Sequence, residues 1–487
     1  MRTWRADLYL YCSAATAIAI FAPPVSLYWD SFGYVVQAIT GQVGGLGLGR
    51  PLFILISHGL ALLWFAVGGS AAHLEPVLRL AWAAVSCAAA PLTWRLARRA
   101  SLSARAAAFA GLAVAVSPAM AHVSGSVLTD GPATSLCLLA SLLGVHAILD
   151  SGEAHAVPGR RSVRLAAGAG IAIGVAIGLR EQSVLGAAGL AFLVPLARPT
   201  DRWRLAGTML LAAALVVAGP ILFVWATQPG DVDTIRTWLR GMAHDREVMT
   251  RGWRDVGLFA LWLLALGPAV TVAAATAWAR PRGSVWQLGG VLLAVSAPAL
   301  AQLVLAAGFR GISYSPRFLL PAFPGALAIP GAWAVDRWMG RSRARVLVTA
   351  ACLVVPLIVA APYVQARAAP LVATLQNLPG RLAELGPTAV IVTGQPCPAI
   401  ALDRAILAHD APSSPGPTWQ AICPGWAWPK PIAPRLDEAR RGGRLVVLDL
   451  RPTSWIGAEQ QAALGEITAY QRVVASGGTA PTLIVWR

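Results

Sequence analysis

The sequence predicts a mainly α-helical, polytopic membrane protein with a small α/β domain at its C-terminus. Of the 487 residues, 56% are hydrophobic and only 13% are charged, about half the charged fraction of ordinary soluble domains. The mean hydropathy is +0.62. Apolar stretches long enough to cross a bilayer, about 20 residues each, recur up to about residue 364. We therefore expect a transmembrane domain over residues 1–365 and an extracytoplasmic domain over residues 366–487.

The basic residues predict the orientation of the chain. The net charge of +17 comes almost entirely from arginines in short clusters between apolar stretches, which is typical of cytoplasmic loops and gives no indication of a nucleic-acid partner. All compact clusters fall on the cytoplasmic side if the N-terminus is inside and the apolar stretch 51–67 does not cross the membrane. These clusters are residues 95–105, 160–164, 198–204, 280–282 and 337–345.

This threading predicts about eleven transmembrane helices and one interfacial or re-entrant helix, residues 51–67, in the first outer loop. The first apolar stretch, residues 8–25, follows two arginines but no A-x-A-like cleavage site follows it. We interpret it as a retained anchor and not as a signal peptide. The expected location is a bacterial-type inner (plasma) membrane, with a cytoplasmic N-terminus and the C-terminal domain outside.

The C-terminal part has a different pattern. Apolar, β-branched runs at 388–393, 444–450 and 481–486 alternate with helix-like stretches such as 371–385 and 436–441, as in a small α/β domain. Cys397 and Cys423 would face an oxidising compartment there, which favours a disulfide between them. Two free thiols stay the alternative, because a sequence does not give the distance between the sulfurs.

Two aspartates mark the outer face. Asp30 comes after the first span and has aromatic residues on both sides, and Asp130 precedes the span 133–149. Each could act as a general base or support one, and each could instead cap the helix that follows it. The threading places both on the same face as Arg180, Arg310 and Arg317, a set able to hold a phosphate group while a base acts beside it.

Other candidates for substrate binding rest on their position alone. Glu181 follows Arg180, and the two could form an ion pair or contact a phosphate or a sugar. Tyr34 lies close to Asp30, and Tyr314 lies between Arg310 and Arg317, although tyrosines are also common at membrane interfaces. His244 belongs to a polar outer loop, residues 227–256, that is long enough to be a lid. His58 and His122 are expected to be packed histidines and not metal ligands.

The order of these motifs resembles the GT-C superfamily of membrane glycosyltransferases, which includes protein O-mannosyltransferases and the aminoarabinose transferase of lipid A. The resemblance covers roughly residues 1–365. The matching pieces are Asp30, Gly49-Arg50-Pro51-Leu52, Leu78-Arg79-Leu80 ahead of a span ending in Arg95-Leu-Ala-Arg-Arg99, Thr129-Asp130-Gly131-Pro132, and Ser315-Pro316-Arg317-Phe318-Leu319-Leu320-Pro321.

The resemblance implies roles for individual residues. Asp30 would be the base and Asp130 its partner, while Arg317 would contact the phosphate of the lipid donor. Arg310, Arg180 and Arg50 are further predicted phosphate contacts, which the resemblance itself does not imply. The family often has His-Pro-Pro where this chain has Arg50-Pro51-Leu52, and many members have an acidic pair where this chain has Asp30-Ser31. No cofactor is implied with certainty, and these departures leave the requirement for a divalent metal open.

The function expected from the resemblance is transfer of a sugar from a polyprenyl-phosphate donor to a glycan, lipid or protein acceptor on the outer face. One alternative is a transporter or flippase of a lipid-linked saccharide. That function would require polar or charged residues deep within several spans, whereas the spans here consist largely of Ala, Leu and Val. The other alternative is a non-catalytic membrane partner of a cell-wall assembly.

Overall fold

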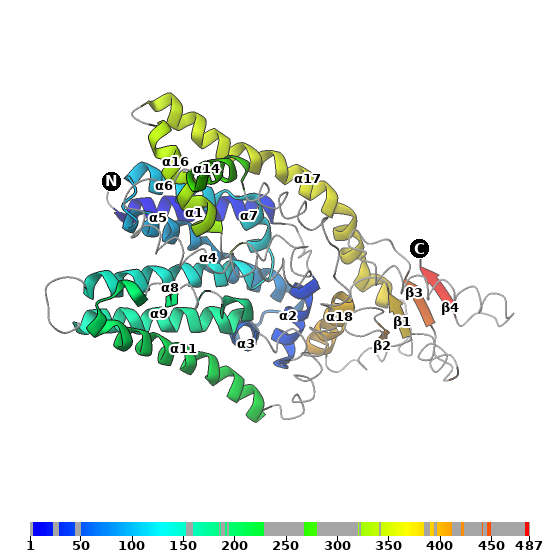
Figure 1. Cartoon of the computed structure of the whole chain (residues 1–487). Coiled ribbons are helices and arrows are strands. Elements are labelled where there is room, and N and C mark those ends of the chain that lie inside the picture. The colour runs from blue at the N-terminus through cyan, green and yellow to red at the C-terminus, as the bar shows by residue number, and fades with distance from the viewer. Residues whose placement is uncertain are drawn as a thin grey trace. The chain divides into compact units, whose positions relative to one another are not determined.

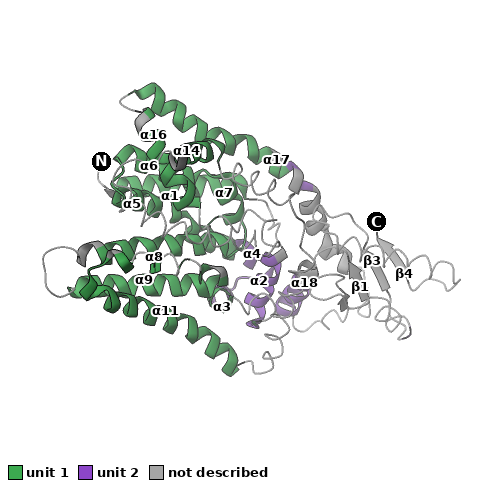
Figure 2. Cartoon of the chain, viewed as in Figure 1, with its two compact units in different colours: residues 1–22, 43–56, 77–365 green, residues 23–42, 57–76, 366–487 purple. Residues whose placement is uncertain are grey.

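The protein is described here by a computed structural model, which is mainly helical as predicted (Figure 1). The structure describes residues 3–22, 29–43, 50–151, 159–184, 186, 190–191, 194–227, 267–279, 320, 323–339, 342–383, 390–393, 397–411, 420–422, 441, 446–449 and 483–486. The chain divides into two compact units (Figure 2). Unit 1 contains residues 1–22, 43–56 and 77–365, and unit 2 contains residues 23–42, 57–76 and 366–487.

Unit 1 contains most of the apolar helices. They are α1 (Thr3–Phe21), α4 (Leu74–Cys87), α5 (Ala89–Arg99), α6 (Ala104–Ala115), α7 (Pro118–Ser124), α8 (Asp130–Ser151), α9 (Arg160–Leu179), α11 (Pro199–Thr227), α14 (Pro268–Ala279), α16 (Ile329–Met339) and α17 (Arg343–Ala383). Helix α4 begins in unit 2, and α17 continues into it. Among the described residues, five helical segments are long and apolar enough to cross a membrane: 71–99, 130–148, 160–179, 199–227 and 343–366. Helices α6 and α7, bent by 49°, would together make a sixth. A multi-pass membrane protein is thus confirmed, while the number eleven and the orientation stay predictions.

Helix α3 (Pro51–Ala66) is the apolar stretch expected not to cross. Its 16 residues span about 24 Å at 1.5 Å per residue, which is less than the roughly 30 Å of a hydrocarbon core. This length supports the prediction of an interfacial or re-entrant helix without establishing where the membrane lies.

Helices α8, α9 and α11 pack as neighbours (Figure 1), and glycines make the close approach possible. A Cβ atom at Gly174 would lie 2.9 Å from the carbonyl oxygen of Ala213 on α11, and one at Gly170 would collide with the carbonyl oxygen of Met209. The small-xxx-small spacing of the two glycines is the usual way for helices to approach backbone to backbone in a membrane.

Unit 2 contains a parallel sheet in the order β2-β1-β3-β4. The strands are β1 (Val390–Thr393), β2 (Gln420–Ile422), β3 (Val446–Asp449) and β4 (Leu483–Trp486). Each of the three predicted runs contains one strand, while β2 and helix α18 (Cys397–Asp410) were not predicted from the sequence. Residues 371–383 of the helix-like stretch 371–385 form the end of α17. The extracytoplasmic location of the sheet stays a prediction.

The first loop and the C-terminal part meet within unit 2. Helix α2 (Trp29–Thr40) packs against α18, and the Asp410 carboxylate accepts hydrogen bonds from the backbone N–H groups of Ala71 (2.9 Å) and Ala72 (3.3 Å). These residues open the short helix η2 (Ala71–His73). The His409 ring lies 3.9 Å from that of Phe65. Helix α18 thus contacts both α2 and the turn before α4. The predicted domain boundary after residue 365 stays a prediction.

Candidate functional site

A buried ion pair joins two of the predicted site residues in unit 1. Asp130 is the first residue of α8, and Arg180 follows the last residue of α9, where the backbone becomes extended. The Arg180 guanidinium contacts the Asp130 carboxylate. The side chains are 1% and 2% exposed, respectively. A pair of charges so deeply buried is retained only when each compensates the other.

The second pair lies next to the first along the chain. Arg50 donates from Nε to Glu181 Oε2 (3.0 Å) and from Nη2 to Oε1 (3.3 Å). This fork-to-fork geometry is the strong, orientation-specific form of the arginine–carboxylate contact. Arg50 precedes the proline that begins α3, where the fixed φ of proline suits a first helical turn. Because Arg180 and Glu181 are consecutive, the Asp130–Arg180 and Arg50–Glu181 pairs form one charge-balanced cluster, called here the charged cluster.

The electrostatics of the charged cluster favour ionised side chains. Burial alone would raise the pKa of Glu181, but the charge and hydrogen bonds of Arg50, together with the charge of Arg180, hold that pKa below its usual value. Glu181 is 27% exposed, so it is the most accessible member of the cluster, while the side chain of Arg50 is 7% exposed. The Arg50–Glu181 pair is thus the end of the cluster that a ligand could reach first.

Three buried hydroxyl groups come just before Asp130 in the sequence. Ser124, Ser126 and Thr129 are all buried, and their hydroxyl oxygens find no hydrogen-bond partner among the described residues. A Cβ atom at Gly131 would lie 2.6 Å from the Ser124 hydroxyl, so only glycine leaves this space open. Sequence reasoning missed these hydroxyls, although three of them within six residues before Asp130 were a visible signal.

The remaining described candidates lie in unit 2. Asp30 lies in the first turn of α2 and is partly exposed, where a carboxylate interacts favourably with the helix dipole. Asp30 is the second residue of α2 and not the N-cap residue itself, so both the capping role and the role as a base stay predictions. Tyr34 is fully buried. His58 contacts the carbonyl oxygen of Ala38 through Nδ1 at 2.7 Å, which agrees with the expected packed histidine.

Several predicted site residues lie outside the described residues. They are Arg310, Arg317, Tyr314, His244, Cys423 and the side chain of Cys397, so the phosphate contacts at 310 and 317 and the disulfide stay predictions. Within the part of the chain that the structure describes, no group of three or more His, Cys, Asp or Glu side chains could hold a metal ion.

Neither a protein-family model nor a curated protein matches the sequence, but solved structures do. ArnT from Cupriavidus metallidurans in the apo state is 13% identical with a TM-score of 0.57, and the match covers 90% of this chain and 88% of ArnT. The chain has the GT-C fold. The resemblance expected from the motifs is thereby confirmed at the level of the fold.

Two further matches agree with the GT-C fold. ArnT from C. metallidurans bound to undecaprenyl phosphate is 14% identical with a TM-score of 0.50, covering 83% of this chain and 76% of ArnT. The Archaeoglobus fulgidus oligosaccharyltransferase tethered to an acceptor peptide containing the NVT sequon is 14% identical with a TM-score of 0.51, covering 83% of this chain. The chain spans less than two thirds of the archaeal enzyme, 63% in that structure and 56% in another.

Proposed function

We propose that this protein transfers a sugar from a polyprenyl-phosphate donor to an acceptor on the outer face of a membrane. The observation that carries the proposal is the GT-C fold, shared with ArnT over 90% of this chain and 88% of ArnT. One of the ArnT structures holds undecaprenyl phosphate, and the archaeal transferase holds an acceptor peptide. A lipid-linked donor and a separate acceptor are therefore the substrates to test here.

The charged cluster supports binding of a lipid phosphate. A phosphate group arriving at the cluster needs positive partners in a dry environment, and the cluster as it stands is charge-balanced. Glu181 is the most accessible of its four side chains, so the phosphate would displace Glu181 from the fork of Arg50. Arg180 would stay fixed by Asp130. In this proposal Asp130 is a positioning residue, and Arg50 is the group that exchanges partners. Arg310 and Arg317 keep their predicted roles as further phosphate contacts.

The proposed chemistry is a single displacement or its two-step equivalent at the anomeric carbon. The acceptor oxygen forms the new glycosidic bond, the bond between the anomeric carbon and the phosphate oxygen breaks, and polyprenyl phosphate leaves. Asp30 takes the proton of the acceptor hydroxyl. Tyr34, Tyr314 and His244 keep their predicted roles as substrate contacts. Tyr34 is fully buried in unit 2, so its contact with a sugar requires local opening.

The test uses purified full-length protein in proteoliposomes with undecaprenyl-phosphate hexose and pentose donors. Release of undecaprenyl phosphate is followed by mass spectrometry in the presence of an envelope extract as the acceptor source. Asp30→Asn should slow release by about 10²-fold, the usual scale for a lost general base, while donor binding persists. Asp7→Asn is the matched control, since Asp7 pairs with Arg95 and has no proposed catalytic role. Full activity of Asp30→Asn would show that Asp30 is not the general base and that its carboxylate serves only the start of helix α2.

The same experiment separates the transferase from a transporter or flippase. A transporter would move the lipid-linked sugar between leaflets without forming free undecaprenyl phosphate. The fold does not favour this alternative. Translocation of intact donor without any release of phosphate lipid, in the wild-type protein, would establish the transporter instead.

A further inference from the structure

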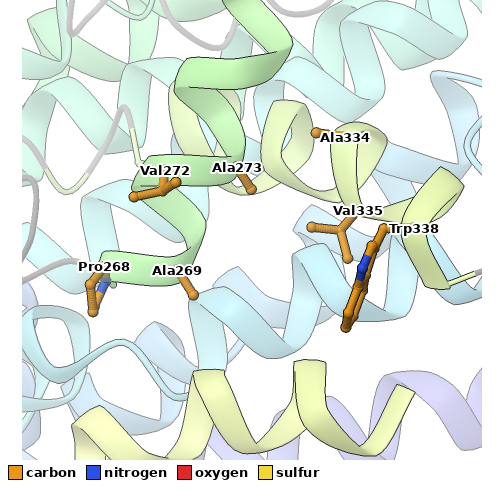
Figure 3. Close-up of a pocket in the computed structure, with 7 residues that line it drawn as sticks. All are labelled: Pro268, Ala269, Val272, Ala273, Ala334, Val335 and Trp338. Carbon is orange, nitrogen blue, oxygen red and sulfur yellow. The ribbon is translucent and has the colours of Figure 1, made fainter. Parts of the chain in front are cut away.

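An apolar pocket of about 500 Å³ opens between α14 and α16 in unit 1. Figure 3 shows its lining, with Ala269 and Ala273 of α14 on the side toward Val335 and Trp338 of α16. The described lining residues are all uncharged and apolar apart from the indole N–H. None of them belongs to the charged cluster, so this pocket is separate from the proposed catalytic machinery.

A cationic side chain lies at the tryptophan edge of this pocket. The guanidinium carbon of Arg345, in the first turn of α17, is 5.9 Å from the centroid of the Trp338 ring. Arg345 Nη1 also donates a hydrogen bond of 3.0 Å to the Trp338 carbonyl oxygen. The two contacts fix the guanidinium over the ring. Arg345 is nevertheless exposed, so an anion can approach it from outside the protein.

The nearest described acidic side chain on α16 is engaged elsewhere. Asp336 Oδ1 accepts a hydrogen bond of 2.5 Å from the hydroxyl of Ser103, the N-cap residue of α6. Its carboxylate is therefore held toward α6 and does not neutralise Arg345. Arg343, two residues before Arg345 and also exposed, adds a second positive charge. The described side chains thus combine an apolar pocket with a positively charged edge.

We propose that this pocket holds one acyl chain of an anionic phospholipid, with the phosphate of the lipid beside Arg345. In a bilayer, a pocket that offers no polar partners is filled by hydrocarbon and not by water. Residues 337–345 form a predicted cytoplasmic cluster, and the cytoplasmic leaflet carries the anionic lipids that basic pockets between transmembrane helices bind. A polyprenyl-phosphate donor would instead present its phosphate on the predicted outer side, so the proposal rests on the predicted topology and not on the transferase activity.

Native mass spectrometry of the purified full-length protein tests the proposal with two probes, phosphatidylglycerol and phosphatidylcholine carrying the same acyl chains. The wild-type protein should retain phosphatidylglycerol in preference to phosphatidylcholine. Arg345→Gln should weaken retention of phosphatidylglycerol about fivefold, the scale expected for one arginine near an anionic surface. Arg343→Gln is the matched control and should have a smaller effect, because no contact joins Arg343 to Trp338 among those described.

Filling the pocket gives a second, independent arm. Ala334→Phe should reduce retention of both lipids while Arg345 is unchanged, and the melting temperature without added lipid reports whether this variant folds. If Ala334→Phe does not fold, the comparison of Arg345→Gln with Arg343→Gln still tests the proposal. Equal retention of both lipids by the wild-type protein, or equal loss in Arg343→Gln and Arg345→Gln, would overturn the proposal. Displacement of phosphatidylglycerol by undecaprenyl phosphate at equal concentration would assign the pocket to the donor chain instead.

Discussion

At the scale of single residues, the Asp130–Arg180 pair should contribute strongly to stability because both side chains are almost fully buried. Asp130→Asn leaves the Arg180 charge without its carboxylate, so we expect the free energy of unfolding to fall by about 3–5 kcal/mol. The double variant Asp130→Leu with Arg180→Met should recover much of that loss, since neither buried charge remains. Thermal unfolding of the detergent-solubilised protein measures both effects.

The exposed pair of Arg95 and Asp7 is the control for that experiment. Its atoms lie 2.6 Å apart, but Arg95 is 52% exposed, so Arg95→Gln should cost no more than about 1 kcal/mol. A loss in Asp130→Asn no larger than in Arg95→Gln would show that the Asp130–Arg180 contact is not a buried, mutually compensating pair.

Asp403 on α18 should make stability depend on pH. Burial raises its pKa to about 7, above the roughly 3.9 of an unfolded chain, so the folded state binds the proton more tightly. The free energy of unfolding should therefore fall as the pH rises from about 4 to about 7. Asp403→Asn should be more stable than the wild-type protein above pH 7, by up to about 4 kcal/mol, and the two melting curves should converge on acidification.

Asp410, on the same helix, should show the opposite sign. Burial opposes ionisation there, but the hydrogen bonds from Ala71, Ala72 and His409 hold its pKa below the usual value. Its stabilising effect is present above the unfolded pKa and is lost as the pH falls through the folded pKa. Asp410→Asn should thus be less stable than the wild-type protein at neutral pH. Parallel pH profiles of the Asp403 and Asp410 variants would contradict both assignments.

The sequence indicated Arg180 and Glu181 as site candidates but did not indicate their partners. Arg180 and Glu181 were expected to pair with each other or to contact a substrate, yet each pairs with a residue far along the chain, and Arg50 is 131 residues from Glu181. Consecutive residues at the end of a helix point in different directions, so their partners depend on which helices approach. That approach is a tertiary property, and local sequence carried no signal for it.

At the scale of helices and strands, the contact between α9 and α11 depends on missing side chains. Gly170→Ala would place a methyl group against the backbone of α11 at Met209, which has no flexible end that can move away. We expect a loss of about 1–3 kcal/mol, typical of overpacking, measured as a lower melting temperature. Gly207→Ala on α11 is the matched control, since nothing lies within 4 Å of a Cβ atom there.

Gly207→Ala should be neutral or stabilising by up to about 1 kcal/mol, because alanine favours a helix more than glycine does. Equal effects of the two substitutions would mean that helix propensity, and not close packing, determines the behaviour of Gly170.

The secondary structure was predictable where a pattern was long enough. Apolar stretches predicted long apolar helices such as α1 and α8, and β-branched runs predicted β1, β3 and β4. Strand β2 has only three residues and owes its place to parallel pairing with β1, a long-range contact that composition does not reveal. Helix α18 follows β1 after three residues. Its two short apolar runs are separated by Asp403 and Arg404, and the sequence analysis did not distinguish them from the surrounding loops.

At the scale of the whole molecule, the predicted threading fixes which side of the membrane each loop faces. If α3 does not cross, the first loop and the C-terminal part lie outside and the 95–105 cluster lies inside. Ser31 is buried and is therefore a poor reporter. Exposed positions serve better: Thr40 at the end of α2, Ala104 at the start of α6 and Ala408 on α18. Each is changed to cysteine after the six native cysteines have been replaced.

A membrane-impermeant maleimide applied to intact spheroplasts should label Thr40→Cys and Ala408→Cys, and should label Ala104→Cys only after permeabilisation. The physical reason is the tendency of arginine-rich loops to stay on the cytoplasmic side of the membrane. The clusters at 95–105, 160–164, 198–204, 280–282 and 337–345 share one side only when α3 is not a span, and a bias of this kind sets the orientation of most multi-pass proteins. Labelling of Ala104→Cys together with Thr40→Cys in intact cells would show that α3 crosses. It would also invert every later loop and move the proposed phospholipid pocket to the outer leaflet.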